Sequence, residues 1–312
     1  MIRQNQFLAR NKGVRPRTLR VRLRAWVLAG LWLSTVASDA AELPDLYQIV
    51  PDLVPPLVID GAPQAGRRVR QTTSGWEGTA VHHVLYLPTD WDPTKRYPVI
   101  VEYAGNGGYK NAFGDGCDGT VDHSNLGYGL TAGKGVIWVC LPFVELNASE
   151  KRNATNWWGD VEETKRYCLA TVRAVCADFG GDRAKVVLAG FSRGSIACNY
   201  IGLHDDAIAQ LWCGFFCHSH YDGVIERWRY PAADRTSAAA RLRRLKGRPQ
   251  WISHEGNVAA TQDYLRDTGV KGEFTFQAVL FRNHSDQWVL RDLPERRAAR
   301  LWLEHLLDLT KS

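Results

Sequence analysis

A Gly-Phe-Ser-Arg-Gly pattern at 190–194 constrains this chain more than any other feature, because it stands between an apolar run and a helix-compatible stretch. Residues 186–189 are apolar, too short for a helix and followed by glycine, which predicts a fully buried strand. Residues 195–203 contain no proline and are compatible with a helix. Glycine suits both positions, because in a sharp turn of this kind a side chain at 190 or 194 would collide with neighbouring backbone. The pattern therefore predicts a strand, a sharp turn and a helix, with the Ser192 hydroxyl at the carboxyl end of the strand and directed out of the sheet.

Further apolar runs alternate with helix-compatible stretches in the later part of the chain. Strands are predicted at 67–73, 79–87, 98–103, 135–141, 184–190, 211–217, 249–254 and 273–281. Helices are predicted at 160–179, 194–206, 258–268 and 293–309. This alternation is typical of βαβ units. The sequence therefore predicts an α/β fold with a mostly parallel sheet of about eight strands and helices on both faces.

The first 40 residues have the composition of a signal peptide. Eight Lys or Arg residues precede an apolar run at 25–36, which is too short to span a bilayer. Ser38 and Ala40 place small residues at the −3 and −1 positions of a cleavage site. We therefore expect a secreted or periplasmic protein without stable membrane insertion.

The chain without that segment is nearly neutral. The full sequence has 39 Lys or Arg and 33 Asp or Glu, a net charge of +6, but residues 1–40 contain eight of the basic residues and one of the acidic residues. The remaining 31 basic and 32 acidic residues leave no excess of positive charge that would favour binding to nucleic acid.

Five prolines in 41–65 predict an extended arm. Residues 66–312 are long enough for one large α/β domain.

A serine hydroxyl attacks efficiently when a base takes its proton, and the usual base is a histidine. The serine turn, together with a histidine far downstream in Phe-Arg-Asn-His-Ser-Asp at 281–286, resembles the α/β-hydrolase superfamily over residues 66–309. The overall layout resembles secreted esterases of the polyhydroxybutyrate-depolymerase and feruloyl-esterase type. The resemblance implies an α/β-hydrolase catalytic domain at 66–312 with Ser192 as nucleophile and His284 as base.

The resemblance also implies a reaction. An exported serine hydrolase of this type cleaves carboxylic esters through an acyl-enzyme and needs no cofactor. Its expected substrates are small-molecule or polysaccharide-linked esters, including acetyl and feruloyl esters. A serine peptidase and a thioesterase are alternatives, because the same serine turn serves all three reactions. A non-enzymatic binding protein on this scaffold is disfavoured by the presence of both Ser192 and His284.

The acid that orients the histidine has two main candidates. The resemblance implies the order serine, acid, histidine along the chain. Glu255 directly follows a predicted strand, in the usual place for the acid, but the chain has His-Glu-Gly-Asn at 254–257 in place of the usual pattern with aspartate. Asp222 follows the preceding strand, where some lipases have their acid. Glu255 is favoured over Asp222, with Asp263 and Asp286 as further alternatives.

An oxyanion site needs two N–H donors directed at the developing negative charge. The backbone of Arg193, directly after the serine, is the first candidate. The second should come from the glycine-rich loop at 103–108, which follows the strand at 98–103. Gly105 and Asn106 are the candidates for this second donor.

Trp157 and Trp158 are candidate substrate-binding residues. They lie in Asn-Trp-Trp-Gly at 156–159, after a strand and before a helix. Ligands of open α/β sheets bind at that edge, and tryptophans there are able to stack on a sugar or line an acyl pocket. The alternative is that the pair belongs to the core.

Two further patterns remain. His218, His220 and Asp222 imitate the H-x-H-x-D motif of metallohydrolases, since alternate residues of an extended chain share a face. The motif has a further histidine directly after the aspartate, but this chain has Gly223 there. Metal catalysis is therefore disfavoured, and no metal site is assigned.

The chain has seven cysteines, of which Cys117, in a glycine-rich loop, is the best candidate for a disulfide.

Overall fold

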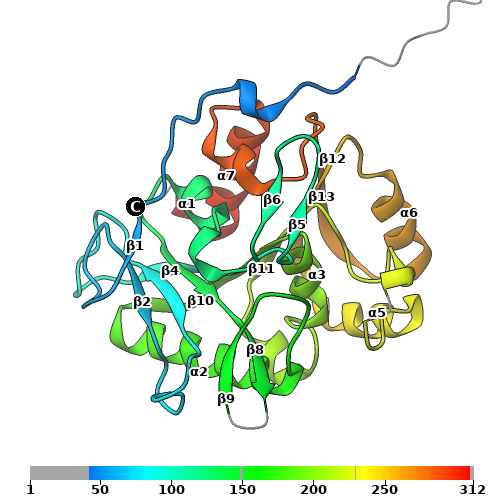
Figure 1. Ribbon diagram of the computed structural model, residues 1–312. Helices are drawn as coiled ribbons and strands as arrows, with labels where there is room; N and C mark the ends of the chain where they lie inside the picture. Colours follow the sequence, from blue (N-terminus) through cyan, green and yellow to red (C-terminus); the bar gives the residue numbers. More distant parts are fainter. Residues whose placement is uncertain (1–41, 148–149, 229, 310–312) are drawn as a thin grey trace, which may run out of the picture. The chain divides into compact units, whose positions relative to one another are not determined.

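A computed structural model describes residues 42–147, 150–228 and 230–309. Within these residues, nine strands form one central sheet (Figure 1). From one edge to the other they are β1 (Val58–Ile59), β2 (Arg68–Gln71), β3 (His83–Tyr86), β7 (Ile137–Leu141), β4 (Tyr97–Tyr103), β10 (Gly181–Phe191), β11 (Gly214–His218), β12 (Gly247–Glu255) and β13 (Gly272–Val279). β3 runs antiparallel to β2 and β7, and the other neighbouring pairs are parallel.

The mostly parallel α/β sheet of about eight strands is confirmed, with one strand more than the sequence predicted. The ninth strand, β1, lies in the segment predicted as an extended arm and pairs with β2. It has two residues, which is too short to produce a periodic pattern in the sequence. The arm also contacts the segment after β13, where the N–H of buried Leu46 donates to Asn283 Oδ1 over 2.7 Å.

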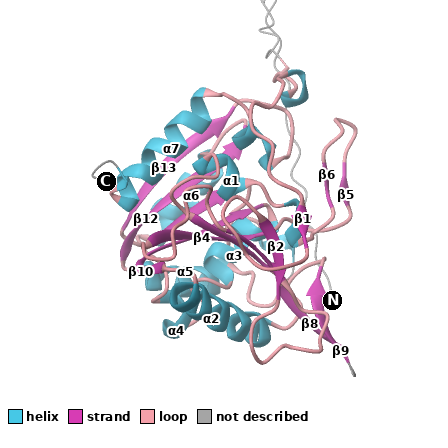
Figure 2. Cartoon of the chain, turned by 90° about the vertical axis from the view of Figure 1, so that its left-hand side faces the viewer, coloured by secondary structure: helices cyan, strands magenta, loops and turns pink. Residues whose placement is uncertain are grey.

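Helices cover both faces of the sheet, as expected. The α-helices are α1 (Leu126–Thr131), α2 (Val161–Asp178), α3 (Arg193–Tyr200), α4 (Asp206–Ala209), α5 (Arg235–Leu242), α6 (Ala259–Thr268) and α7 (Pro294–Leu307), and short 3₁₀ helices lie at Leu46–Gln48, Val121–His123, Glu226–Trp228, Arg243–Leu245 and Asp286–Leu290. In Figure 2, α1 and α7 lie on one side of the sheet, and α2 and α3 lie on the other. The predicted helix at 194–206 is too long, because α3 ends at Tyr200; α4 is a separate helix, capped by Asp205 through a bond from Ile208 N.

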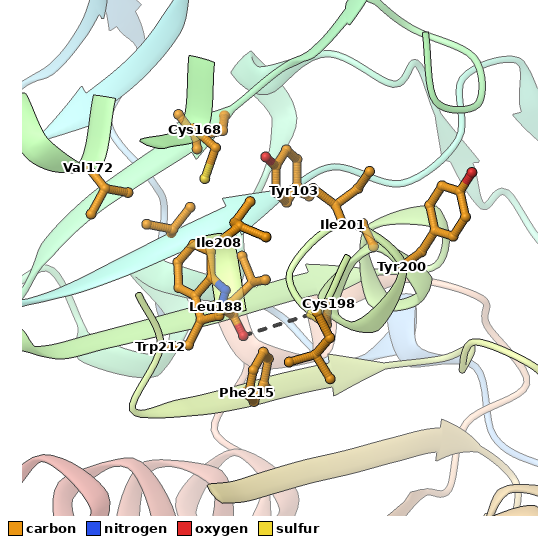
Figure 3. Close-up of a cluster of buried hydrophobic side chains, with 14 of the residues drawn as sticks. Tyr103, Cys168, Val172, Leu188, Cys198, Tyr200, Ile201, Ile208, Trp212 and Phe215 are labelled. Carbon is orange, nitrogen blue, oxygen red and sulfur yellow. Dashed lines mark hydrogen bonds between the residues drawn. The ribbon is translucent and has the colours of Figure 1, made fainter. Parts of the chain in front are cut away.

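Alternation along the central strands produces a separate core on each face. On β10, Val186 and Leu188 pack in the cluster that includes α2 and α3, whereas Val187 and Ala189 pack in the cluster that includes α1 and α7. Figure 3 shows part of the first cluster, with the Cys198 thiol near the Leu188 carbonyl. Full burial of each such aliphatic side chain contributes roughly 1.5–3 kcal/mol. The strand that precedes Ser192 is therefore held firmly from both sides.

Two small hairpins lie in the segments that connect strands of the central sheet. β5 (Tyr109–Lys110) pairs with β6 (Gly116–Cys117), and β8 (Phe143–Asn147) pairs with β9 (Glu150–Ala154). The first hairpin follows β4 and the second follows β7, so both start at the carboxyl edge of the parallel strands. This edge also carries the ends of β10, β11 and β12, which are in register at Phe191, His218 and Ser253.

The cysteine prediction is corrected. All seven cysteines lie within the described residues and all are free thiols, including Cys117, the residue favoured for a disulfide. The predicted signal peptide lies outside the described residues. Among the described residues no helix is both long enough and apolar enough to cross a membrane.

Candidate active site

Ser192 occupies a strained turn between β10 and α3. Its backbone has φ of 53° and ψ of −111°, which is uncommon for a residue with a side chain. A Cβ at Gly190 would lie 2.1 Å from backbone atoms of Gly194, and a Cβ at Gly194 would lie 1.9 Å from Tyr103 O. The two glycines are therefore required by the close approach of backbone on both sides of the serine.

Three side chains from different segments form a hydrogen-bonded series at the carboxyl edge. Ser192 Oγ lies 3.1 Å from His284 Nε2, and His284 Nδ1 lies 3.0 Å from Glu255 Oε1. Ser192 follows β10, Glu255 ends β12, and His284 follows β13. These distances allow a base to take a proton from the serine while a carboxylate holds the base. The structure thus brings together Ser192, His284 and the favoured acid.

The Glu255 carboxyl is poised to carry a negative charge. Burial raises its pKa, but the hydrogen bond with His284 and the nearby His218 lower it by more, so that the pKa falls to about 2. An ionised carboxylate favours the proton on the facing imidazole nitrogen. Nδ1 of His284 then carries that proton, and Nε2 is left to accept one from Ser192.

The loop that carries His284 is held by a carboxylate that the sequence analysis missed. Asp115, a buried residue of the β5–β6 hairpin, accepts bonds from His284 N over 2.8 Å and from Asn283 Nδ2 over 3.0 Å. The ring centroids of Tyr109 and Phe191 each lie 4.9 Å from that of His284. Asp115 thus holds the backbone of His284, and two aromatic rings flank its imidazole.

Asp222, the alternative acid, does not belong to this group. Its carboxylate accepts bonds from Arg241 Nε over 2.8 Å, from Arg241 Nη2 over 3.0 Å and from Tyr230 Oη over 2.6 Å. The side chain is buried in this network. Asp222 is therefore the partner of a buried arginine, because its oxygens point toward α5 rather than toward His284.

The metallohydrolase motif is not assembled either. His218 Nδ1 lies 3.0 Å from Ser253 Oγ and its Nε2 lies 3.2 Å from Ser285 O. The His220 ring packs on Trp228 with centroids 4.5 Å apart, while Asp222 is bound to Arg241. Although the three residues alternate along the chain, each side chain is engaged with a different neighbour.

The predicted oxyanion donors belong to two segments, the start of α3 directly after Ser192 and the loop after β4. Arg193 is the first residue of α3, so its N–H has no acceptor within the helix. In the loop after β4, the N–H of Gly107 donates to Thr155 O over 2.8 Å, which leaves Gly105 and Asn106 as the candidate donors. A Cβ at Gly105 would lie 2.9 Å from Cys117 Sγ and 3.0 Å from the Phe191 ring. A larger residue at this position would therefore require the Cys117 and Phe191 side chains to shift.

The strand order, the serine turn and the placement of the three side chains together decide the fold. The chain has the α/β-hydrolase fold. It resembles, with 15% identity, a fungal esterase from Rhizomucor miehei over 80% of this chain and 85% of that chain, with a TM-score of 0.54. Esterase 2 of Thermogutta terrifontis, phosphorylated by paraoxon, matches over 80% and 97% with 15% identity and a TM-score of 0.51.

A third structural neighbour is an S-formylglutathione hydrolase from Agrobacterium tumefaciens. It shares 12% identity over 76% of this chain and 94% of that chain, with a TM-score of 0.50. No family model and no curated protein matches the sequence. The similarity therefore lies in the fold, and the site has to be interpreted from its own residues.

The two tryptophans at 157 and 158 differ in exposure. Trp157 is 39% exposed, and its ring centroid lies 6.4 Å from that of Trp228. Trp158 is 4% exposed and packs among Phe143, Tyr200 and Tyr230. The prediction of a substrate-binding role is therefore wrong for Trp158, which is a core residue, and stays open for Trp157.

Two cavities flank the site. The larger, about 910 Å³, begins at Gly105 and Phe191 and extends along polar side chains to the arm. Its polar lining includes Arg68, Arg70, Lys110, Asp118, Asp122 and Asn125. The smaller, about 530 Å³, is lined by Ser219, His220 and His254. Both cavities therefore lie beside the site, one at Gly105 and Phe191 and the other at Ser219 and His220, while Ser192 itself lines neither.

Proposed function

We propose that this protein is an exported serine hydrolase that cleaves carboxylic esters through an acyl-enzyme. The observation that carries the proposal is the series of two contacts, 3.1 Å from Ser192 Oγ to His284 Nε2 and 3.0 Å from His284 Nδ1 to Glu255 Oε1. This is the arrangement in which a serine loses its proton to an imidazole held by a carboxylate. The esterase neighbours support the same chemistry by fold alone.

The first half of the reaction forms the acyl-enzyme. Ser192 Oγ attacks the ester carbonyl carbon while His284 Nε2 takes the hydroxyl proton. The carbonyl oxygen becomes negative and is stabilised by N–H groups of Arg193 and of Gly105 or Asn106. The carbon–oxygen bond of the ester then breaks, and His284 returns the proton to the departing alcohol. Glu255 stabilises the imidazolium while it carries that proton.

The second half releases the acid. Water enters the position of the alcohol and gives a proton to His284 Nε2 as its oxygen attacks the acyl carbonyl. The same N–H groups stabilise the second oxyanion. Collapse of this intermediate breaks the bond to Ser192 Oγ, which takes back its proton from the imidazolium. The enzyme returns to its starting state without any cofactor.

For the substrate, we propose an ester on a polyhydroxylated carrier, such as an acetyl or feruloyl group linked to a polysaccharide. The larger cavity supports this assignment because its lining, which includes Gly105, combines charged donors, such as Arg70 and Lys110, with carboxylates, such as Asp118 and Asp122. A lining that offers both donors and acceptors suits hydroxyl groups, which both donate and accept. Export is proposed from the basic and apolar composition of residues 1–40.

The test is a substrate panel with matched acyl groups. Acetyl, feruloyl and short-chain esters, with simple alcohols and with oligosaccharides, are compared by kcat/KM with the corresponding amides and thioesters. The proposal predicts that esters are the best class and that oligosaccharide carriers improve kcat/KM. Better turnover of amides or thioesters would instead identify a peptidase or thioesterase. The intact mass of the secreted protein, expected to begin near Ala41, tests export.

A further inference from the structure

The side chain of Arg193 is buried next to the nucleophile without a carboxylate partner. It is 1% exposed, and among the described residues it forms no ion pair with a carboxylate. Burial lowers the pKa of its guanidinium to about 9. Its carbon Cζ lies 4.2 Å from the centre of the Phe143 ring. Burying an arginine without a counter-ion is unfavourable, so the contacts that it does make are informative.

Those contacts are three backbone carbonyls from two separate segments. Nη1 donates to Trp157 O over 2.7 Å and to Ala154 O over 3.4 Å. Nη2 donates to Gly119 O over 3.3 Å. The segment at 154–157 begins at the last residue of β9, and Gly119 follows the β5–β6 hairpin. The planar guanidinium, which offers donors in fixed directions, therefore joins these segments to the start of α3.

The segment at 154–157 in turn holds the loop at 105–107, and Gly119 lies close against both. Trp157 N donates to Asn106 Oδ1 over 2.6 Å, and Gly107 N donates to Thr155 O over 2.8 Å. Gly119 lies so close that a Cβ there would be 2.8 Å from Gly107 N and 2.0 Å from Thr155 O. A continuous series of hydrogen bonds thus runs from the Arg193 guanidinium through 154–157 to Asn106.

We propose that Arg193 is a positioning residue that fixes both donors of the oxyanion site. Its own backbone N–H is one donor, and its guanidinium holds the loop at 105–107 that supplies the other. The inference rests on the proposed function, because it assigns this arrangement to the oxyanion of ester cleavage. Since these donors act on a charge that develops during the reaction, their displacement lowers kcat more than it raises KM.

The test compares three substitutions by kcat, KM and thermal stability. Arg193→Met keeps an apolar stem over Phe143 but removes the hydrogen bonds, and Arg193→Lys keeps the charge but loses the planar set of donors. Arg248→Met is the matched control. Arg248 also donates to backbone carbonyls, to Leu245 O over 2.7 Å and to Trp212 O over 3.0 Å, but lies away from the serine.

We expect Arg193→Met to lose about 100-fold in kcat, the effect of losing one oxyanion donor, with KM within about threefold of wild type. Arg193→Lys should lose at least about tenfold, because charge without the donors does not hold the loop. Arg248→Met should keep its kcat. A kcat near wild type in Arg193→Met overturns the proposal. Full recovery in Arg193→Lys also overturns it, since charge rather than positioning would then be responsible.

Asn106→Ala provides a second route if Arg193→Met does not fold. It removes the bond from Trp157 N without disturbing a buried charge, and it should also lower kcat with little change in KM. The double variant with Arg193→Lys should lose less kcat than the product of the two single fold-losses, because both substitutions act on one series of contacts. Multiplicative effects would contradict the proposed connection.

Hydrogen exchange separates this inference from the proposed function. The amides of the 105–108 loop should exchange faster in Arg193→Lys than in wild type, while those of the central strands stay unchanged. This result does not depend on any substrate. If wild type cleaves no ester but the loop exchange changes as stated, the proposed function fails and the positioning contact stands. Unchanged loop exchange, in an active enzyme, refutes the positioning role.

Discussion

The hydroxyl oxygen of Ser219 lies 2.9 Å from His284 Nδ1, the same nitrogen that lies 3.0 Å from Glu255 Oε1. Ser219 also donates to Glu255 Oε2 over 3.0 Å. With the proton on His284 Nδ1, the imidazole donates to both residues and the three side chains form a closed triangle. Ser219 has φ of 89°, an unfavourable value for a residue with a side chain. It follows β11 and is buried.

Ser219→Gly should lower kcat without lowering the melting temperature. The glycine relieves the backbone strain, but the hydroxyl that supports the imidazolium and Glu255 is lost. A hydrogen bond to a charged group contributes about 1.5–3 kcal/mol, so kcat should fall roughly tenfold or more. Ser219→Ala, which keeps the strain and loses the same hydroxyl, is the matched control and should show a similar kcat. Wild-type kcat in both variants would show that the triangle does not assist the reaction.

Glu255→Gln and Asp222→Asn should have opposite effects on activity and stability. The amide at 255 supplies the wrong partner for His284 Nδ1, so kcat should fall at least about 100-fold while the protein stays folded. Asp222→Asn breaks the buried pair with Arg241, which should cost about 3–5 kcal/mol of unfolding free energy. Its folded fraction should keep its kcat. Steady-state kinetics and urea unfolding of both variants measure this, and the reverse pattern would identify Asp222 as the acid.

Asp286→Asn should stabilise the protein more at neutral than at acid pH. Burial, followed by the charge of Glu102, raises the pKa of Asp286 from 3.8 to about 7. The unfolded chain therefore loses this proton at lower pH than the folded chain does. The free energy of unfolding of wild type therefore falls as the pH rises from about 4 to about 7. Above that range Asp286 is ionised in the folded protein, and the full cost of burying its charge applies. The amide removes the penalty but still accepts the bond from Asn125 Nδ2.

Urea unfolding near pH 4 and near pH 8 tests this sign. The difference in unfolding free energy between Asp286→Asn and wild type should increase by on the order of 3 kcal/mol between these values. Asp263→Asn is the control, because that side chain is 60% exposed at the surface. It should produce nearly the same difference at both pH values. A difference for Asp286→Asn that is constant, or that shrinks as the pH rises, would refute the raised pKa.

The sequence predicted those parts of the site that depend on local backbone. Gly190 and Gly194 are required by contacts within a few residues of Ser192 and with the adjacent strand, so the motif is visible in the chain itself. The long apolar strands were also predicted, since burial on both faces gives continuous apolar runs. β1 and the β5–β6 hairpin were missed because two-residue strands produce no period.

The contributions of Ser219 and Asp115 depend on the tertiary structure. Asp115 contacts His284 across 169 positions of sequence, and nothing in the chain near either residue indicates the contact. Ser219 reaches Glu255 because β11 and β12 are adjacent and in register. The helix α5 had a readable signal that was missed, since Asp234 precedes an alanine-rich stretch and caps its first turn.

The most direct test of the central claim is mass spectrometry of the acyl-enzyme. Wild-type protein, quenched with acid within the first turnover of an activated ester, should gain the mass of one acyl group, located on the peptide that contains Ser192. Ser192→Ala should gain none, and its kcat should fall by up to roughly a million-fold, as when a triad member is removed. Acylation of another residue, or turnover by Ser192→Ala near the wild-type rate, would contradict the account.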